Sequence, residues 1–182
     1  MAGIELYMSA GTFLNIQQTQ RYMHRCNIVE PQKVFTIGNF KVLPFDLRHD
    51  AAEPLGFLIR YKDGNSILAC TDTYYIPYMF TNLNNLLIEV NYSEAIIRER
   101  IESGVLNVMQ ARRTRANHMS LETAIKFLKS LDLTNVNNII LIHLSDGNSH
   151  AENFKQAVTA ATGKTCLIAD KNMTIDLSLT PF

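Results

Sequence analysis

Three apolar segments of the sequence each end in a side chain that could bind a metal ion. One leads into Asp72, the second (residues 139–142) into His143, and the third (residues 40–45) into a polar segment that contains His49. Each reads as a strand, and ligands in open sheets gather beyond the carboxyl ends of strands. Imidazole and carboxylate are ligands for zinc, manganese or iron. The sequence therefore predicts a metal centre that contains these three residues.

Each of the three residues also has a purely structural interpretation. Asp72 could cap the turn after its strand through its carboxylate. His143 could be a hydrogen-bonded histidine at the rim of the core, and His49 could be a solvated loop residue. The argument for a site is their joint placement, because three residues of ligand type follow three predicted strands.

His118 precedes a predicted helix over residues 121–131 that Ser120 is expected to cap. The amino-terminal end of a helix favours anions, so His118 could act as a general acid or as a partner for phosphate. It could equally be an ordinary loop residue. Glu89, close to the end of a predicted strand over 86–90, could be a buried structural carboxylate or a site residue, and the sequence does not separate these two roles.

A basic cluster precedes His118 and consists of Arg112, Arg113 and Arg115. Such a cluster is usually a solvated helix face, but arginine is also well suited to contact a phosphate ester. Lys plus Arg (17) equals Asp plus Glu (17) over the whole chain. This balance argues against a strongly cationic nucleic-acid-binding domain, although it leaves room for a local basic patch.

The 182 residues are 47% hydrophobic, which suits one domain with a sizeable core. The three cysteines are widely spaced and form no C-x-x-C pair, which argues against disulfides and a structural zinc site. No secretion signal and no run of about 20 apolar residues is recognisable. We therefore expect a cytoplasmic protein that does not bind membranes.

Strand and helix patterns alternate along the chain, with Gly38-Asn39 and Asp63-Gly64 as hairpin signals. This order predicts a single α/β or α+β domain with mixed sheets. The expected strands cover residues 4–8, 33–37, 40–45, 55–61, 66–71, 86–90, 138–144, 166–169 and 173–177. The expected helices cover residues 12–26, 94–102, 121–131 and 148–162, and residues 104–116 read as mixed.

The order and spacing of five segments resemble the metallo-β-lactamase-fold hydrolases. The resemblance is strongest to ribonuclease Z and to the small bacterial exonuclease-like and cyclic-nucleotide phosphodiesterase branch. The segments are 49–57 (His-Asp-Ala-Ala-Glu-Pro-Leu-Gly-Phe), 71–74 (Thr-Asp-Thr-Tyr), 87–91 (Leu-Ile-Glu-Val-Asn), 118–122 (His-Met-Ser-Leu-Glu) and 143–148 (His-Leu-Ser-Asp-Gly-Asn). Each segment alone is weak evidence, whereas the series in this order is specific.

The resemblance implies a four-layer αββα sandwich with a two-metal site, zinc or manganese, along one edge. It implies that His49 and His143 bind opposite metals, that Asp72 bridges them, and that His118 assists phosphate stabilisation or protonation of the leaving group. The implied reaction is attack of a metal-activated hydroxide on a phosphodiester of a nucleotide or nucleic acid. The neutral net charge favours a small nucleotide over a long polyanion.

The sequence departs from this family at its main motif, His-x-His-x-Asp-His, which none of the five histidines forms. We therefore expect residues 1–182 to be a single α+β domain, a partial sandwich without the upstream part of the family fold and with an incomplete metal site. Three explanations stay open: a shortened form of an active hydrolase, a half-module completed by a partner chain or by a second copy in a homodimer, and a non-catalytic binding module.

Overall fold

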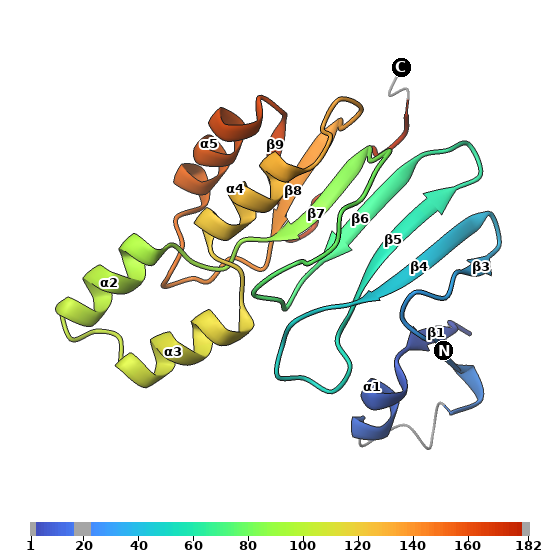
Figure 1. Cartoon of the computed structure of the whole chain (residues 1–182), viewed down its shortest axis with the longest axis horizontal. Coiled ribbons are helices and arrows are strands. Elements are labelled where there is room, and N and C mark those ends of the chain that lie inside the picture. The colour runs from blue at the N-terminus through green and yellow to red at the C-terminus, as the bar shows by residue number, and fades with distance from the viewer. Residues whose placement is uncertain (1–2, 17–22, 180–182) are drawn as a thin grey trace.

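The computed structural model describes residues 3–16 and 23–179. Its main feature is a seven-stranded mixed sheet in the order β3-β4-β5-β6-β7-β8-β9 (Figure 1). Neighbouring strands are antiparallel from β3 to β6 and parallel from β6 to β9. The strands are β3 (Phe35–Ile37), β4 (Phe40–Asp46), β5 (Leu55–Tyr61), β6 (Ser66–Cys70), β7 (Asn85–Glu89), β8 (Asn138–Ile142) and β9 (Cys166–Ile168).

Two hairpins and a run of apolar strands explain this topology. Gly38 (φ 54°) and Gly64 (φ 95°) take positive φ in the turns between β3 and β4 and between β5 and β6, a conformation that glycine adopts at little cost. The most apolar strands, β7 and β8, occupy inner positions in the parallel part of the sheet. Such runs are typical of strands covered on both faces.

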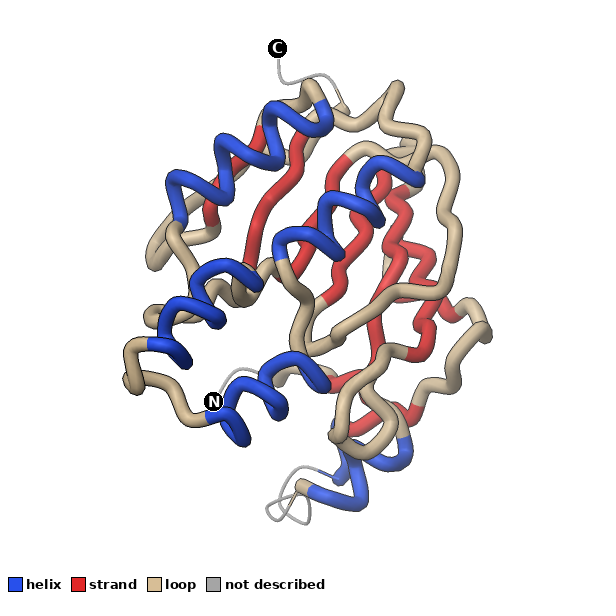
Figure 2. The backbone as a smooth tube through the Cα atoms, turned by 60° about the vertical axis from the view of Figure 1, so that its left-hand side comes forward, coloured by secondary structure: helices blue, strands red, loops and turns tan. Residues whose placement is uncertain are grey.

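One face of the sheet carries the core and two helices, α4 (Leu121–Ser130) and α5 (Ala151–Thr162). Figure 2 shows both helices lying across the strands. Their apolar side chains pack against the alternate strand residues that point towards them. This core includes Leu68, Leu86, Ile88, Ile139 and Leu141 from the sheet and Phe127, Leu128, Phe154 and Val158 from the helices.

The opposite face of the sheet is also apolar but is less well covered. Phe57, Ile59, Ile67, Leu87 and Leu167 are partly exposed and do not belong to the core cluster. Register places their side chains on the face opposite Leu68 and Leu86, because neighbouring residues of a strand point to opposite sides. Of a four-layer sandwich, the described residues thus supply the seven-stranded sheet and the helical layer on one side of it.

Helices α2 (Glu94–Glu102) and α3 (Val108–Asn117) form a hairpin at the edge of the sheet where β6, β7 and β8 end (Figure 1). Ser93 and Asn107 cap their first turns by accepting hydrogen bonds from backbone N–H groups. The hairpin has a small core of its own around Tyr92, Ile97 and Ala111. Its second helix delivers His118 to the edge of the sheet as the C-cap residue that follows α3.

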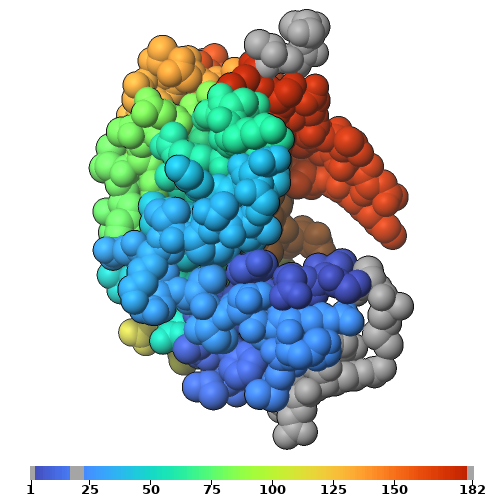
Figure 3. All heavy atoms as spheres, turned by 90° about the vertical axis from the view of Figure 1, so that its right-hand side faces the viewer, coloured from blue at the N-terminus to red at the C-terminus, as the bar shows by residue number. Residues whose placement is uncertain are grey.

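The N-terminal part forms a small unit of β1 (Leu6–Met8), α1 (Ala10–Asn15), the 3₁₀ helix η2 (Met23–Arg25) and β2 (Cys26–Ile28), with β1 and β2 parallel. Figure 3 shows this unit, coloured blue, against the neighbouring hairpin, where the rings of Tyr7 and Phe35 stack at 5.2 Å. Ser9 caps α1 and also donates to the carbonyl of Glu53 at 2.8 Å. The unit is thereby tied to the loop that carries His49.

Most predicted elements agree with the structure, but two do not. The helix expected over residues 12–26 is wrong at its end, because α1 stops at Asn15 and Cys26 lies in β2; residues 17–22 lie outside the described residues. The strand expected over 173–177 is also wrong, since this segment pairs with no strand. It is held instead by the carbonyl of Leu177, which accepts from Asn85 at 3.2 Å. No helix in the described ranges is long and apolar enough to cross a membrane.

Candidate metal centre

The polar residues of the candidate site meet because several strands end at the same edge of the sheet. Strands β6, β7 and β8 are parallel, and β4 runs in the same direction because it is two antiparallel steps from β6. Glu89 is the last residue of β7, while Asp72 and His143 follow β6 and β8. His118 comes to the same edge from the end of α3.

Asp72, Glu89, His118 and His143 each offer a ligand atom, and these atoms all lie within 4.8 Å of one another. Two imidazoles and two carboxylates are a donor set suited to zinc, manganese or iron. The Asp72 side chain is 47% exposed and that of His143 42%, so the group opens to solvent on one side. The group therefore offers the types of ligand atom, and the opening to solvent, that a metal ion with room for water or substrate needs.

Glu89 is fully buried and connects the two histidines of the group. Its Oε1 lies 2.7 Å from Nδ1 of His118 and 2.9 Å from Nδ1 of His143, and its Oε2 accepts the backbone N–H of Thr73 at 2.8 Å. Two ligands on one tetrahedral zinc would stand roughly 3.3 Å apart, so these contacts are hydrogen bonds. Glu89 thus orients both rings and leaves both Nε2 atoms free.

Burial dominates the protonation of this group. It raises the pKa of Glu89 to about 7, although the hydrogen bond from Thr73 and the charge of His143 act in the opposite direction. Burial also lowers the pKa of His118, against the attraction of the Asp72 and Asp50 charges. In the metal-free protein at neutral pH, Glu89 is therefore poised between its charged and neutral forms.

Asp72 and His143 share an unusual backbone conformation, with φ values of 53° and 56°. A left-handed conformation costs a non-glycine residue roughly 1–2 kcal/mol. Around them, Asn91 donates to the carbonyl of His143 at 2.9 Å, and the His143 Nδ1 lies 3.5 Å from Asp72 Oδ1. Strained residues of this kind cluster at functional sites, and here they turn both side chains towards each other.

The structure places His49 beside this group rather than within it. The loop that carries it is tied to the segment after β6 by two hydrogen bonds. The backbone N–H of Arg48 donates to Thr73 Oγ1 at 2.9 Å, and the backbone carbonyl of Arg48 accepts the N–H of Tyr74 at 3.1 Å. The ring of His49 packs edge-on to His118 with centroids 5.6 Å apart, and His118 packs on His143 at 5.1 Å. The three imidazoles therefore form a row along the edge of the sheet.

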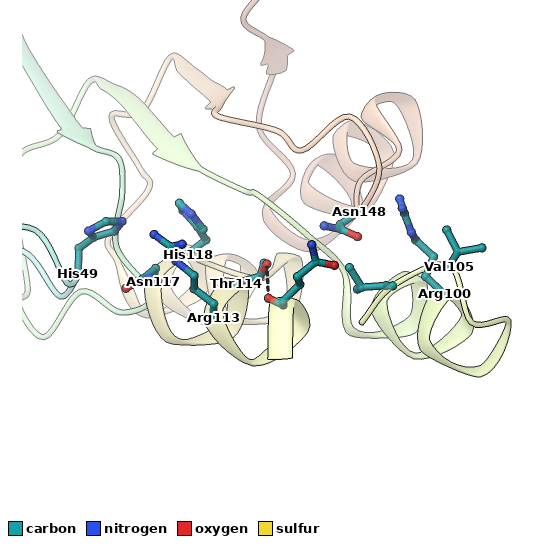
Figure 4. A pocket seen from close by; sticks show the side chains of 10 residues that line it. His49, Arg100, Val105, Arg113, Thr114, Asn117, His118 and Asn148 are labelled. Atoms are coloured by element: carbon teal, nitrogen blue, oxygen red, sulfur yellow. Dashed lines mark hydrogen bonds between the residues drawn. The ribbon is translucent and has the colours of Figure 1, made fainter. Parts of the chain in front are cut away.

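A cavity of about 490 Å³ starts at His49 and His118 and extends along α3 (Figure 4). The described residues that line it are His49, Arg100, Val105, Leu106, Gln110, Arg113, Thr114, Asn117, His118 and Asn148. None of these is acidic, and two are arginines, so the cavity favours an anionic ligand.

The three arginines of the predicted basic cluster have different positions. Arg113 lines the cavity, whereas Arg112 is exposed and does not line it. Arg115 is paired with Glu94 through an Nη2–Oε2 contact of 2.7 Å, and this pairing lowers the pKa of the Glu94 carboxyl. Only Arg113 of the three thus faces the site.

Sequence reasoning left Glu89 undecided, and it missed Asp50 and Asn117. The signal for Glu89 was its charge within the otherwise apolar run Leu-Leu-Ile-Glu-Val, at the end of a strand like the other candidates. Asn117 donates to Asp50 at 3.0 Å, and 67 residues separate the two. No local pattern announces such a contact.

Comparison with family models gives no match for this chain, and comparison with curated proteins gives none either. Solved structures do match. The metallo-β-lactamase fold protein YhfI from Bacillus subtilis superposes with a TM-score of 0.63 at 16% identity, over 90% of this chain and 61% of that protein. Zn(2+)-bound PqqB from Methylobacterium extorquens gives 0.70 at 16% identity, over 97% and 66%.

Human tRNase Z, short form, gives a TM-score of 0.55 at 16% identity, over 96% of this chain and 68% of that protein. The chain thus spans about three fifths to two thirds of the length of these structures. Similarity at this level of identity concerns the fold, and here it extends over nearly all of the chain. The chain accordingly has the α+β fold of the metallo-β-lactamase-like proteins, as the order of its motifs predicted.

Proposed function

We propose that this chain carries the downstream part of a metal-dependent hydrolase that cleaves phosphodiesters of nucleotides or nucleic acids. One observation carries the proposal: a carboxylate–imidazole group of metal-binding type adjoins a cavity whose lining, among the described residues, has arginines and no acidic side chain. Two resident cations of the zinc or manganese type would neutralise developing phosphate charge and supply a hydroxide nucleophile.

In this proposal His49, Asp72 and His143 hold metal, and His118 serves the phosphate or the leaving group. Glu89 lies against Nδ1 of His118, so it stabilises the imidazolium form, which carries a proton on Nε2. Burial lowers the pKa of His118 and makes that proton easier to give up. His118 also lines the cavity, where a leaving oxygen would accept the proton.

Arg113 is the proposed phosphate contact among the basic residues, because it lines the cavity that His118 also lines. A guanidinium can bind two phosphate oxygens at once. Two of the structurally similar proteins agree with the proposed chemistry, since one is a tRNase and another is zinc-bound. The absence of a global positive charge favours a small nucleotide as substrate.

The experiment is to incubate the purified chain with Mn²⁺ or Zn²⁺ and a generic phosphodiester such as bis(p-nitrophenyl) phosphate. Hydrolysis that depends on added metal and is lost in Asp72→Asn would support the proposal. A chain that neither binds metal nor hydrolyses the diester would contradict it and favour a non-catalytic binding module.

A second function is favoured by the partly exposed apolar face of the sheet, which includes Phe57, Ile59, Ile67 and Leu87. Apolar surface of this kind is usually covered by a partner. In this alternative the chain is a half-module that a second chain, or a second copy, completes. Sedimentation tests whether the chain forms a homodimer. If it does, Ile67→Lys should convert the dimer into a monomer. A wild-type chain that is monomeric at micromolar concentration would exclude the homodimer.

A further inference from the structure

The cavity beside the metal centre has an arginine towards each of its two ends. Figure 4 shows His118 and Arg113 towards one end and Arg100 and Asn148 towards the other, which we call the distal end. The volume of about 490 Å³ lies within the range of roughly 300–1,000 Å³ that is typical of small-molecule sites. The proposed reaction uses His118 and Arg113, and it leaves the distal end without a role.

Two separate elements build the distal end. Arg100 belongs to α2, and Asn148 lies in the segment between β8 and α5. Nη1 of Arg100 donates to the backbone carbonyl of Gly147. A Cβ at position 147 would collide with the same guanidinium, so the glycine is what allows this close approach. The contact therefore holds the charged group of Arg100 at the wall of the cavity.

The charge of Arg100 is not neutralised by the protein. Arg115, on the neighbouring helix, is paired with Glu94, whereas in the part of the chain that the structure describes Arg100 forms no ion pair. Arg100 is partly buried, and no acidic residue lines the described wall of the cavity. Removing a charge from water without a counter-charge is costly. The distal end thus favours an anion.

Unpaired polar atoms mark the same end of the cavity. Of the described residues, only Arg100 and Asn148 have a buried side-chain nitrogen or oxygen without a hydrogen-bond partner, and the atoms are Nε and Oδ1 respectively. Buried polar groups in native proteins nearly always have a partner, and an unpaired one costs free energy. The protein by itself therefore leaves the distal end unsatisfied, as expected of a site that a ligand completes.

We propose that the distal end is a second anion subsite, which binds a further phosphate group of the substrate while the scissile diester lies at His118 and Arg113. The inference rests on the proposed function and narrows its substrate to nucleotides with more than one phosphate. Guanidinium suits this ligand because its planar N–H donors match phosphate oxygens. The further phosphate is either a terminal one or the next diester of a longer strand.

The test measures binding without metal, by calorimetry in the presence of a chelator. The ligands are the dinucleotide TpT, the same dinucleotide with a phosphate added at its 5′ or its 3′ end, and the trinucleotide TpTpT. At least one of the three ligands with a further phosphate should bind about tenfold more tightly than TpT. A terminal phosphate and a second diester are distinguished by which ligand gains affinity.

Arg100→Gln should abolish this preference, because it removes the charge and keeps a side chain of similar length. Arg98→Gln removes the same charge from an exposed residue of α2 that does not line the cavity, and it should retain the preference. The subsite is overturned if no ligand with a further phosphate binds more tightly than TpT, or if Arg100→Gln keeps the preference.

Gly147→Ala tests the geometry without changing any charge. Gly147 does not have a positive φ, so its backbone accepts alanine, while the added Cβ displaces the guanidinium of Arg100. The preference should fall here too, and a full preference in Gly147→Ala would contradict the subsite.

Turnover of TpT with Mn²⁺ tests the proposed function separately, because TpT has no second phosphate. A chain that prefers a further phosphate through Arg100 but does not hydrolyse TpT keeps the anion subsite and loses the proposed function. Hydrolysis of TpT without any such preference leaves the proposed function standing and overturns the subsite.

Discussion

Glu89 and His143 lie 54 residues apart in the chain, yet the Glu89 carboxylate is 2.9 Å from Nδ1 of His143. The contact exists because β7 and β8 are adjacent and parallel, so that the end of one strand meets the residue that follows the other. The same carboxylate oxygen reaches His118 at 2.7 Å. One buried acid therefore orients two imidazoles, and its protonation should govern the stability of the metal-free site.

The raised pKa of Glu89 predicts how stability depends on pH. Between pH 4.5 and about 7 the native protein binds more protons at this site than the unfolded chain, so the stabilisation is complete below pH 4.5 and is lost as pH rises through 7. The loss is on the order of 3 kcal/mol. Urea unfolding with a chelator present, from pH 4.5 to 8, should show that loss in wild type relative to Glu89→Gln.

His118 acts in the opposite direction, which is why the variant is needed. Its lowered pKa contributes stability that is present above its ordinary pKa and lost as pH falls through the lowered value. Because Glu89 also contacts His118, both unfolding profiles are best measured in a His118→Gln background, which removes this contribution. A difference between wild type and variant that is flat or rises with pH would be inconsistent with a pKa of Glu89 near 7.

His118→Gln should separate catalysis from metal binding. If His118 donates a proton to the leaving group, its removal should lower the turnover of a phosphodiester about 10²–10⁴-fold, while Zn²⁺ affinity stays within about threefold. Steady-state kinetics and calorimetry on the same preparation measure both quantities. A comparable loss of Zn²⁺ affinity would instead identify His118 as a ligand, as its position in the four-residue group also allows.

Arg113 and Arg112 form a matched pair for testing the phosphate contact. Both are exposed arginines on α3, but only Arg113 lines the cavity. Losing a charge-assisted contact typically costs about 1.5–3 kcal/mol, so Arg113→Ala should raise the KM for a phosphodiester roughly 10–100-fold. Arg112→Ala should leave KM within about twofold. Equal effects of the two substitutions would mean that only general charge matters.

Local sequence predicted the strand ends well, because apolar runs such as residues 139–142 have few alternatives to a buried strand. The mixed pattern of 104–116 hid α3, whose buried residues are only Ala111 and Asn117. The strand expected over 173–177 failed because alternation does not guarantee a partner strand. In both cases the secondary structure depends on contacts with distant parts of the chain, which the local sequence does not reveal.

For the candidate site, too, the sequence predicted the residues that local patterns mark and missed those that depend on tertiary contacts. Asp72, His118 and His143 could be named from their types and positions, and the structure brings them together. The buried role of Glu89 depends on which strands are neighbours, and the Asp50–Asn117 contact depends on where α3 docks. Spacing along the chain carries neither kind of information.

The central claim is that this edge of the sheet binds a transition metal, and Asp72→Asn tests it most directly. Asparagine tolerates the left-handed backbone of this position, so the variant should fold while losing a carboxylate ligand. Calorimetry with Zn²⁺ should find binding to the wild-type chain and affinity at least about tenfold weaker in Asp72→Asn. Equal Zn²⁺ affinity of two equally folded proteins, or no binding to either, would contradict the account.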